Sequence, residues 1–353
     1  MLRLKINNNV FDGWTEARIT HGVRQASSSF QLSLTDKWQG KSWQIKPFDK
    51  CELFDDDDAL ITGYVDSAST GYDRESHTVT ISGRSITADC VDCSAESKQF
   101  NNQTIQQIAT DLAKPFGVAV VNDIGELKLI KSFKPDEGST VFESIERLAR
   151  LDGLLVTDDA NGNIVLTRAG EARISTPLVN GENILSASAS YNVSGVFSDY
   201  IIKGQQKGSD DIDAATAAHV KSLVTDSSVT RYRPLLVIAE SQVDLASAKI
   251  RGEWEKNARF GNSQSFTVTV QGWRHANGLW RANNMVKLKD AILGVDADFL
   301  IAAVTYSIDD TSGTLTQLDL APRAAFIPEP LTEKTAASTQ PTIWKELSNV
   351  ATG

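Results

Sequence analysis

Apolar and polar residues alternate along the first 95 positions, in short runs separated by clusters of Gly, Asp and Ser. The apolar members of three such runs are Leu2, Leu4, Ile6, Phe30, Leu32, Leu34, Val79 and Ile81. A period of two predicts antiparallel strands with one buried and one solvent-exposed face. The acidic run Asp55–Asp58 falls between two of these strands, and we interpret it as a solvated hairpin loop and not as a cation site.

Residues 96–175 change to a helical pattern. Thr104 with Gln107, and Thr140 with Glu143, have the spacing of a capping box, in which two side chains bond backbone N–H groups at the start of a helix. After each predicted helix, two short apolar runs predict a hairpin. Two helix-and-hairpin units would form a small α+β domain.

The whole chain is therefore predicted to be mainly β with α+β insertions. Residues 1–95 would form a first antiparallel β-barrel, and residues 176–208 with 262–325 a second, similar barrel. Residues 209–261 would be an inserted α/β domain. Residues 326–353, rich in proline and small polar residues, would be a C-terminal arm that is ordered only against a partner.

The insertion itself has three predicted elements. An Ala-rich helix is expected near Ala214–Leu223, and an extended stretch at Arg231–Glu240. A second helix should run from about Val243 to Phe260 and end at Gly261, because glycine is the usual residue after a helix C-terminus.

The prediction of two similar barrels depends on an internal repeat between residues 30–82 and 266–320. Five blocks recur in the same order, although chance alternation can mimic part of such a match. A closed ring of three chains would then place six similar barrels around one axis. The matched blocks are Phe30, Leu32 and Leu34 with Phe266, Val268 and Val270; Trp38 with Trp273; Cys51–Leu53 with Val286–Leu288; Leu60–Ile61 with Leu300–Ile301, followed by Ser67 with Ser307; and Thr78–Thr80 with Thr314–Thr316.

Composition narrows the function classes. The 353 residues carry a formal charge of −10, which argues against a protein whose main function is to bind nucleic acid. No signal-peptide pattern opens the chain, and no apolar run approaches the ~20 residues that span a bilayer. Three cysteines cannot make a disulfide framework, which favours assembly in a reducing cytoplasm. Cys90 and Cys93 have CxxC spacing, but we interpret them as plain thiols, because a second ligand pair for zinc is missing and no strand-then-helix redox pattern is evident.

Motifs for common enzyme classes are absent. The four histidines, His21, His77, His219 and His275, are isolated from one another, so no HExxH zinc motif exists. Gly40–Ser42 lacks the first glycine of a phosphate loop, and no GxSxG occurs. The sequence therefore predicts no catalytic residues, no metal and no cofactor.

Several long blocks resemble the baseplate hub proteins of Mu-like contractile-tailed phages and prophages, the 43 kDa tail protein or protein P family. The resemblance extends to about residue 330. Its most specific stretches are Gly63–Ser69, Gly83–Ala95, Thr140–Leu166, Arg231–Glu240 and Gly272–Asp290.

The resemblance implies a homotrimeric, pseudo-sixfold ring in the tail baseplate of a virion, assembled in the bacterial host cytoplasm. Its partners would be the tail tube protein, a central spike and baseplate wedge proteins, with passage of the genome but no specific nucleic acid binding and no membrane insertion. The spike is expected to be a separate polypeptide, because the C-terminus shows no β-helix repeat. Two alternatives stay open: a tail-associated peptidoglycan hydrolase, and the hub of a type VI-like secretion system.

Four residues are candidates for contacts between subunits. Trp273 and Trp280 flank Asn277–Gly278, which predicts a hairpin turn that would pair His275 with Trp280. Both indoles either anchor a subunit interface or belong to the core. The candidates Arg231 and Arg233 either pair with carboxylates of a neighbour or cover their own domain with their apolar stems.

Overall fold

The computed structural model describes residues 1–7, 9–35, 45–74, 77–170, 172–205, 220–239 and 244–329. The first half of the main sheet contains β1 (Leu2–Ile6), β2 (Asn9–Phe11), β3 (Glu16–Gly22), β4 (Ser29–Thr35), β5 (Lys50–Asp55), β6 (Asp58–Tyr72) and β7 (His77–Ser85). The second half contains β13 (Ala172–Arg173), β14 (Leu178–Val179), β15 (Ile184–Tyr191), β19 (Gln264–Gln271), β22 (Asn284–Asp290), β23 (Val295–Asp309) and β24 (Gly313–Ala321), with the short hairpin β20 (Arg274–His275) and β21 (Gly278–Leu279).

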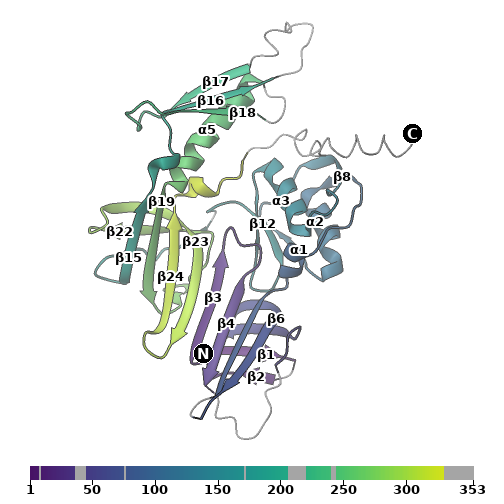
Figure 1. Ribbon diagram of the computed structural model, residues 1–353, viewed down its shortest axis with the longest axis vertical. Helices are drawn as coiled ribbons and strands as arrows, with labels where there is room; N and C mark the ends of the chain where they lie inside the picture. The colour runs from purple at the N-terminus through teal and green to yellow at the C-terminus, as the bar shows by residue number, and fades with distance from the viewer. Residues whose placement is uncertain are drawn as a thin grey trace.

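These two halves form one continuous sheet of 14 strands, in which β3 and β23 pair antiparallel. In Figure 1 the purple strands of the first half lie directly beside the yellow-green strands of the second. The mainly β prediction is confirmed. Two separate closed barrels are not what the described residues form: each half is an open, curved part of the shared sheet, because β3 of one half bonds to β23 of the other instead of closing on its own half.

The two halves repeat the same strand order. The first half runs β3-β4-β7-β6-β5, and the second runs β15-β19-β24-β23-β22. The long strands β6 and β23 have 15 residues each, and each has a bulge at the same place, between Val65 and Ser67 in β6 and between Ile301 and Ala303 in β23. The internal repeat seen in the sequence is thus a repeat of topology.

Strand pairing corrects the predicted alignment of the later blocks. Leu32 stands opposite Ile81, and Val268 stands opposite Leu318, so Ile81 corresponds to Leu318. By the same ladders Ser67 corresponds to Ala303, four residues before the predicted Ser307. Strand alternation repeats every two residues, so a slip by four keeps the same face buried and cannot be detected from the pattern.

Two further blocks also change. Val79 corresponds to Thr316, one residue after the predicted Leu315. The side chains of Val79 and Thr316 are both buried, with exposed fractions of 1% and 0%. Tyr64–Val65, and not Leu60–Ile61, corresponds to Leu300–Ile301, because Cys51 and Val286 stand opposite Gly63 and Phe299. Trp38 lies outside the described residues.

A small α+β domain follows β7. It contains α1 (Ala88–Asp92), β8 (Phe100–Thr104), α2 (Ile105–Ala113), β9 (Val120–Asn122), β10 (Leu129–Phe133), α3 (Val141–Ala149), β11 (Leu155–Asp158) and β12 (Ile164–Thr167), with short 3-10 turns at Lys114–Phe116 and Arg150–Asp152.

Both predicted capping boxes are present, with reciprocal bonds between Thr104 and Gln107 and between Thr140 and Glu143. The hairpin β11–β12 is confirmed. The hairpin predicted after the first helix is wrong: β9 pairs parallel with β12, and β10 pairs with β8. Burial explains the difference, because Phe133 of β10 is buried next to Phe100 of β8.

A second insertion lies between β15 and β19. It contains β16 (Asp199–Gly204), β17 (Val220–Thr225), β18 (Pro234–Ile238) and α5 (Leu245–Asn262), with a 3-10 turn at Val193–Gly195. The sheet order is β17-β16-β18, and α5 packs on β16 and β17. Figure 1 shows this unit at the end of the molecule remote from the N-terminus.

Three predictions for the insertion need correction. β16 was expected in the second barrel but pairs with β17 and β18, where Tyr200 and Ile202 are buried. Residues 220–223 are strand and not the end of an Ala-rich helix; residues 214–219 lie outside the described part. Gly261 lies inside α5, and its role is packing, because a Cβ there would meet the backbone nitrogen of Ala325 at 2.4 Å.

The start of the predicted arm packs on this helix. Phe326 is buried, and the carboxylate of Glu329 forms an ion pair with Arg251. The last 3-10 turn, Arg323–Phe326, leads into this segment and includes Phe326. Residues 330–353 lie outside the described residues.

Candidate interaction surfaces

The two halves of the main sheet meet at a junction between β3 and β23. Along it, Ile19 of β3 stands opposite Tyr306 of β23, and Thr20 stands opposite Thr305 with their hydroxyl oxygens 3.4 Å apart. Ile19 and Tyr306 are almost fully buried. This ladder shows how one half of the repeat binds the other through a strand edge.

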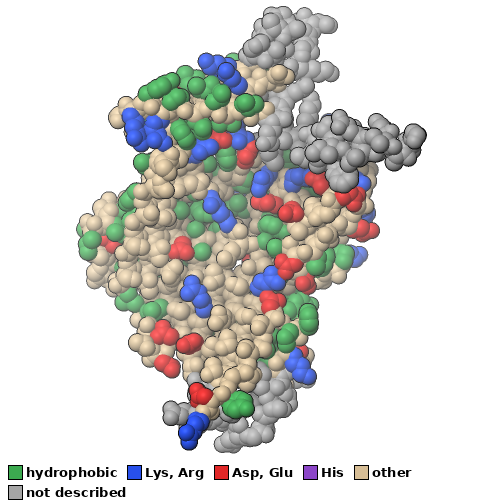
Figure 2. All heavy atoms as spheres, in the orientation of Figure 1, with side chains coloured by type: hydrophobic (Ala, Val, Ile, Leu, Met, Phe, Trp, Pro, Cys, Tyr) green, Lys and Arg blue, Asp and Glu red, His purple; other side chains and the backbone are tan. Residues whose placement is uncertain are grey.

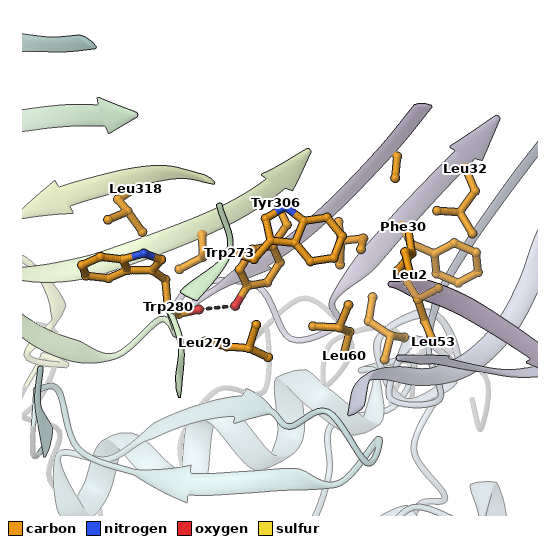
Figure 3. Packing of buried hydrophobic residues seen from close by; sticks show 14 of the residues in the cluster. Leu2, Phe30, Leu32, Leu53, Leu60, Trp273, Leu279, Trp280, Tyr306 and Leu318 are labelled. Carbon is orange, nitrogen blue, oxygen red and sulfur yellow. Dashed lines mark hydrogen bonds between the residues drawn. The ribbon is translucent and has the colours of Figure 1, made fainter. Parts of the chain in front are cut away.

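Trp273 and Trp280 lie in the core at this junction. Their exposed fractions are 4% and 2%, and both belong to one hydrophobic cluster with residues of both halves. The Trp273 indole nitrogen donates to the carbonyl of Ser307 at 3.1 Å, and the Tyr306 hydroxyl donates to the carbonyl of Trp280 (Figure 3). The structure therefore places both tryptophans as core aromatics of their own chain, the second of the two interpretations above.

Ion pairs cross the same junction. The guanidinium of Arg274 donates to Asp55 at 2.9 Å and to Asp58 at 2.5 Å, from the β20–β21 hairpin of one half to the β5–β6 hairpin of the other. Asp56 and Asp57 are exposed, as expected for a solvated loop, whereas only 14% of the Asp55 side chain is exposed. The ends of the acidic run thus tie the halves together, a role that the sequence did not reveal.

The β20–β21 turn differs by one residue from its prediction. His275 pairs with Gly278, so the two turn residues are Ala276 and Asn277. The rings of His275 and Trp280 nevertheless touch, with centroids 5.0 Å apart. The shift allows Trp280 to enter the core, beyond the end of the short hairpin.

A cleft of about 450 Å³ lies where both halves meet the small α+β domain. Near it, the Ser28 hydroxyl donates to Asp158 at 2.9 Å, and the His21 Nδ1 lies 2.8 Å from the same hydroxyl oxygen. The backbone N–H of Ser28 also donates to Asp158 at 2.7 Å. Burial lowers the pKa of His21 to about 4, with a smaller effect of Arg281, and burial raises the pKa of Asp158.

This His–Ser–Asp chain is ordered differently from a hydrolase triad. In a triad the histidine lies between the acid and the nucleophile and takes the proton of the serine hydroxyl. Here Ser28 lies in the middle and donates its proton to Asp158, so the hydroxyl is not presented to His21 as a nucleophile. The geometry supports a link between the β3–β4 turn and the small domain.

Arg231 and Arg233 have different environments in the structure. Arg233 donates to the carbonyls of Ser194 at 2.6 Å and Val196 at 3.1 Å, and its guanidinium stacks on Phe197. It is thus occupied within its own insertion. Arg231 is exposed, beside Tyr232, whose exposed fraction is 85%.

The outer face of the small sheet exposes apolar side chains. Leu223, Leu236 and Ile238 are exposed on the side opposite α5, and Lys203 and Lys221 lie beside them. Figure 2 shows hydrophobic side chains gathered over this unit, bordered by basic ones. This patch was not among the predicted surfaces, although the alternation of exposed and buried residues in β17 is a signal for it.

Several strands of the main sheet pair on one side only among the described residues. β15 and β2, at the two ends of the sheet, pair with β19 and β1. The stretch Ser67–Gly71 of β6 pairs with β7 on one side, because β5 accompanies β6 no further than Tyr64.

Metal ligands, cysteines and membrane spans do not indicate a further functional site in the described part of the chain. Within the described ranges, no group of three His, Cys, Asp or Glu side chains is placed to hold a metal ion. α1 follows β7, but Cys90 lies in the middle of this short helix and Cys93 is its C-cap, so the pair does not open the helix as a redox CxxC does. Burial raises the pKa of the Cys90 thiol to about 12, whereas Cys93 is exposed. None of the helices in the described part of the chain combines the length and apolar character of a membrane span.

Comparisons with known proteins agree on one family. The profile "Mu phage baseplate assembly protein GpP-like, N-terminal" matches residues 1–85, "Baseplate hub protein gp44-like, second domain" matches residues 87–168, and "Mu phage baseplate assembly protein GpP, fourth domain" matches residues 244–329.

Individual relatives cover nearly the whole chain. Baseplate hub protein gp44 of Escherichia phage Mu is 32% identical over 335 residues, 92% of this chain and 88% of the relative. The crystal structure of the 43 kDa tail protein of prophage MuSo2 from Shewanella oneidensis is 35% identical, with a TM-score of 0.81 over 93% of this chain and 99% of that one. The tail protein from Neisseria meningitidis MC58, at 22% identity, shares the fold with a TM-score of 0.77 over 93% of this chain and 98% of its own.

Proposed function

Because the chain belongs to the family of Mu-like phage baseplate hub proteins, we propose that three copies close into a ring that joins the tail tube to a central spike and lets the genome pass. The observation that carries this proposal is the repeat of strand order within one sheet. Three chains with two similar halves each would present six similar walls to a sixfold tube and a threefold arrangement to the spike.

The role of the chain in this proposal is geometric. The described residues hold no arranged nucleophile and base, and the one Ser, His and Asp group near a cleft is a structural link. The insertion with β16, β17 and β18 projects at one end of the molecule (Figure 1), where a wedge protein could reach it. The apolar outer face at Leu223, Leu236 and Ile238 is the surface we assign to such a partner.

The net charge also suits a conduit. Each chain carries −10, and a channel wall that repels phosphate would not hold passing DNA. We expect the inner surface of the ring to be neutral or acidic. An electrostatic map of the assembled ring with a basic bore would contradict this part of the proposal.

The mass of the purified chain in solution tests the ring. Multi-angle light scattering should give three times the chain mass of 38.4 kDa, and negative-stain images should show rings with six lobes. A single-chain mass at all concentrations up to the solubility limit would overturn the proposal.

The two alternatives have separate tests. Clearing of peptidoglycan in a zymogram by the purified chain would support a hydrolase, and secretion-system genes beside its gene would support a type VI-like hub.

A further inference from the structure

We propose that the outer face of the insertion sheet binds an apolar surface of a partner protein that carries an Asp or Glu side chain, and that this carboxylate lies between Lys203 and Lys221. The inference rests on the proposed role of the insertion in meeting a wedge protein. It adds the chemistry that the partner must bring and the place of its charge on the sheet.

The outer face consists of cross-strand rows, because β16 pairs antiparallel with β17 and parallel with β18. One row is apolar, and the next row along the strands is basic at two of its three positions. The apolar row is Leu223, Ile201 and Leu236, and the next row is Lys221, Lys203 and Ile238. Tyr200 and Ile202, which alternate with these residues along β16, are buried on the inner face. The outer face is therefore the one that α5 leaves bare.

Apolar side chains on this face have no covering layer in the described part of the chain. Leu223, Leu236 and Ile238 are exposed by 57%, 51% and 73%. A sheet usually buries its apolar side chains against another layer, and α5 supplies that layer on the inner face alone. An apolar partner surface would remove these side chains from water and gain hydrophobic free energy.

The two lysines form a like-charge pair within the sheet. Lys203 stands directly opposite Lys221, which places their Cβ atoms about 5 Å apart. Both side chains are exposed, and no ion pair joins either of them to a carboxylate among the described residues. Lys5 of β1, in contrast, stands opposite Glu52 and lies 3.1 Å from its carboxylate. Like charges directly opposite each other destabilise a sheet, so a carboxylate placed between the two ammonium groups would relieve a repulsion.

The chain itself contains a bridged pair of this kind. In the described ladders, the other like-charge pair that stands directly opposite is Asp55 with Asp58. Arg274 donates to both carboxylates from the other half of the main sheet and so offsets their repulsion. A separate structural unit thus supplies the opposite charge there. A partner carboxylate would complete the lysine pair in the same way, with the signs reversed.

The rows also give the contact a direction. Apolar partner side chains fit over Leu223 and Leu236, and the carboxylate would lie one row further along the strands, at about 6.6 Å. The row on the other side of the apolar one contains Asp199. A partner turned end for end would bring its carboxylate towards Asp199, and the repulsion between like charges disfavours that orientation.

Cross-linking with a carbodiimide tests the position of the carboxylate, because this reagent joins a lysine amine to a carboxylate without a spacer. The sample is the full chain assembled with the purified baseplate wedge proteins of its own phage. We expect amide links from Lys203 or Lys221 to an Asp or Glu of one wedge protein, located by mass spectrometry. Lys249, which is exposed on α5, is the internal control and should not be linked to that protein.

Charge reversal separates binding from folding. Lys203→Glu with Lys221→Glu should lower the affinity for that wedge protein at least tenfold, whereas Lys203→Arg with Lys221→Arg should retain it. Lys221→Glu alone should weaken binding but raise the urea midpoint of the free chain, because Lys203 then faces an opposite charge. Lys249→Glu is the matched control and should leave the affinity unchanged.

The apolar row has its own variant. Leu236→Ser removes an exposed side chain, so it should leave the urea midpoint of the free chain unchanged and lower the affinity for the wedge protein several-fold. Unchanged affinity for Leu236→Ser and for the double charge reversal would show that the wedge protein binds elsewhere.

The outcomes distinguish this inference from the proposed function. A trimer that still binds the wedge protein after the double charge reversal overturns the inference and leaves the hub role. Links from Lys203 and Lys221 solely to carboxylates of the same chain or of another copy also overturn it, because the pair is then neutralised without a partner. A single-chain mass together with the expected links to a wedge protein would overturn the ring and support the docking surface.

Discussion

The guanidinium of Arg274 lies 2.9 Å from the carboxylate of Asp55, a residue 219 positions earlier in the chain. This contact, with the adjacent bond to Asp58, holds the hairpin of one half against the hairpin of the other. The ion pair lies on the rim of a junction whose centre is apolar. Its energetic contribution should therefore be small and measurable only as a coupling.

A double-mutant cycle measures that coupling. Arg274→Ala, Asp58→Ala and the double variant should give an interaction free energy of about 0.5–1 kcal/mol in urea unfolding, reduced by added salt. Asp57 is fully exposed and does not contact Arg274, so a cycle with Asp57→Ala is the matched control and should give no coupling. Equal couplings in the two cycles would contradict the assignment.

Trp280→Ala should lower the folding stability of the single chain more than it weakens the association of chains. The indole is buried at the junction of the halves, and removal of a buried Trp typically costs about 3–5 kcal/mol. We expect a large fall in the midpoint of urea unfolding. The variant that remains folded should have the same oligomeric mass as the unmodified protein. Phe48→Ala, at a side chain that is 90% exposed, is the control and should leave the midpoint unchanged. Normal stability together with dissociation into single chains would instead indicate a subunit anchor.

Gly63→Ala should be strongly destabilising. β6 crosses β7 so closely that a Cβ at Gly63 would lie 1.8 Å from the carbonyl oxygen of Arg84, which backbone movement alone can relieve. Such overpacking costs about 1–3 kcal/mol or more. Gly71 lies in the same strand with nothing within 4 Å, and Gly71→Ala should change the unfolding free energy by less than about 0.5 kcal/mol. Similar values for both variants, from thermal or urea unfolding, would refute the close-approach explanation.

His21 should make stability fall with acid. Its folded pKa is about 4 against an ordinary value near 6.5, so the unfolded chain takes up the proton first as pH falls. Stability is therefore complete above pH ~6.5 and decreases towards pH 4, by at most about 3 kcal/mol. The raised pKa of Asp158 acts in the opposite sense, because the folded carboxyl takes its proton at higher pH than the unfolded one.

His21→Asn keeps a polar atom near Ser28 and removes this titration. Urea unfolding from pH 4 to 7 should give a smaller loss of stability for the variant than for the native chain. Parallel profiles would show that His21 does not titrate as its burial indicates.

Local signals were read correctly from the sequence. Both capping boxes form, because each is made by side chains three residues apart that meet only within one helical turn. The mainly β character and the repeated strand order also follow from alternation. Pairing across distance was not accessible: β9 and β10 look like a hairpin locally, but each finds a better-buried partner elsewhere.

The candidate site residues show the same limit. Aromatic residues beside a turn suggested Trp273 and Trp280, yet sequence alone cannot distinguish an interface from a core between two halves. The Asp55–Arg274 contact depends on the β3–β23 ladder, which no periodicity specifies. The register of the repeat needed the bulges in β6 and β23, whose positions alternation does not reveal.

The ladder between Ile19 and Tyr306 sets the angle between the two halves of one chain. In the proposed ring, successive chains would have to turn through an angle that divides a full circle; otherwise a head-to-tail contact propagates as an open fibre. A substitution that twists this ladder by a few degrees should therefore favour open polymers over closed particles, even where no individual contact is weakened.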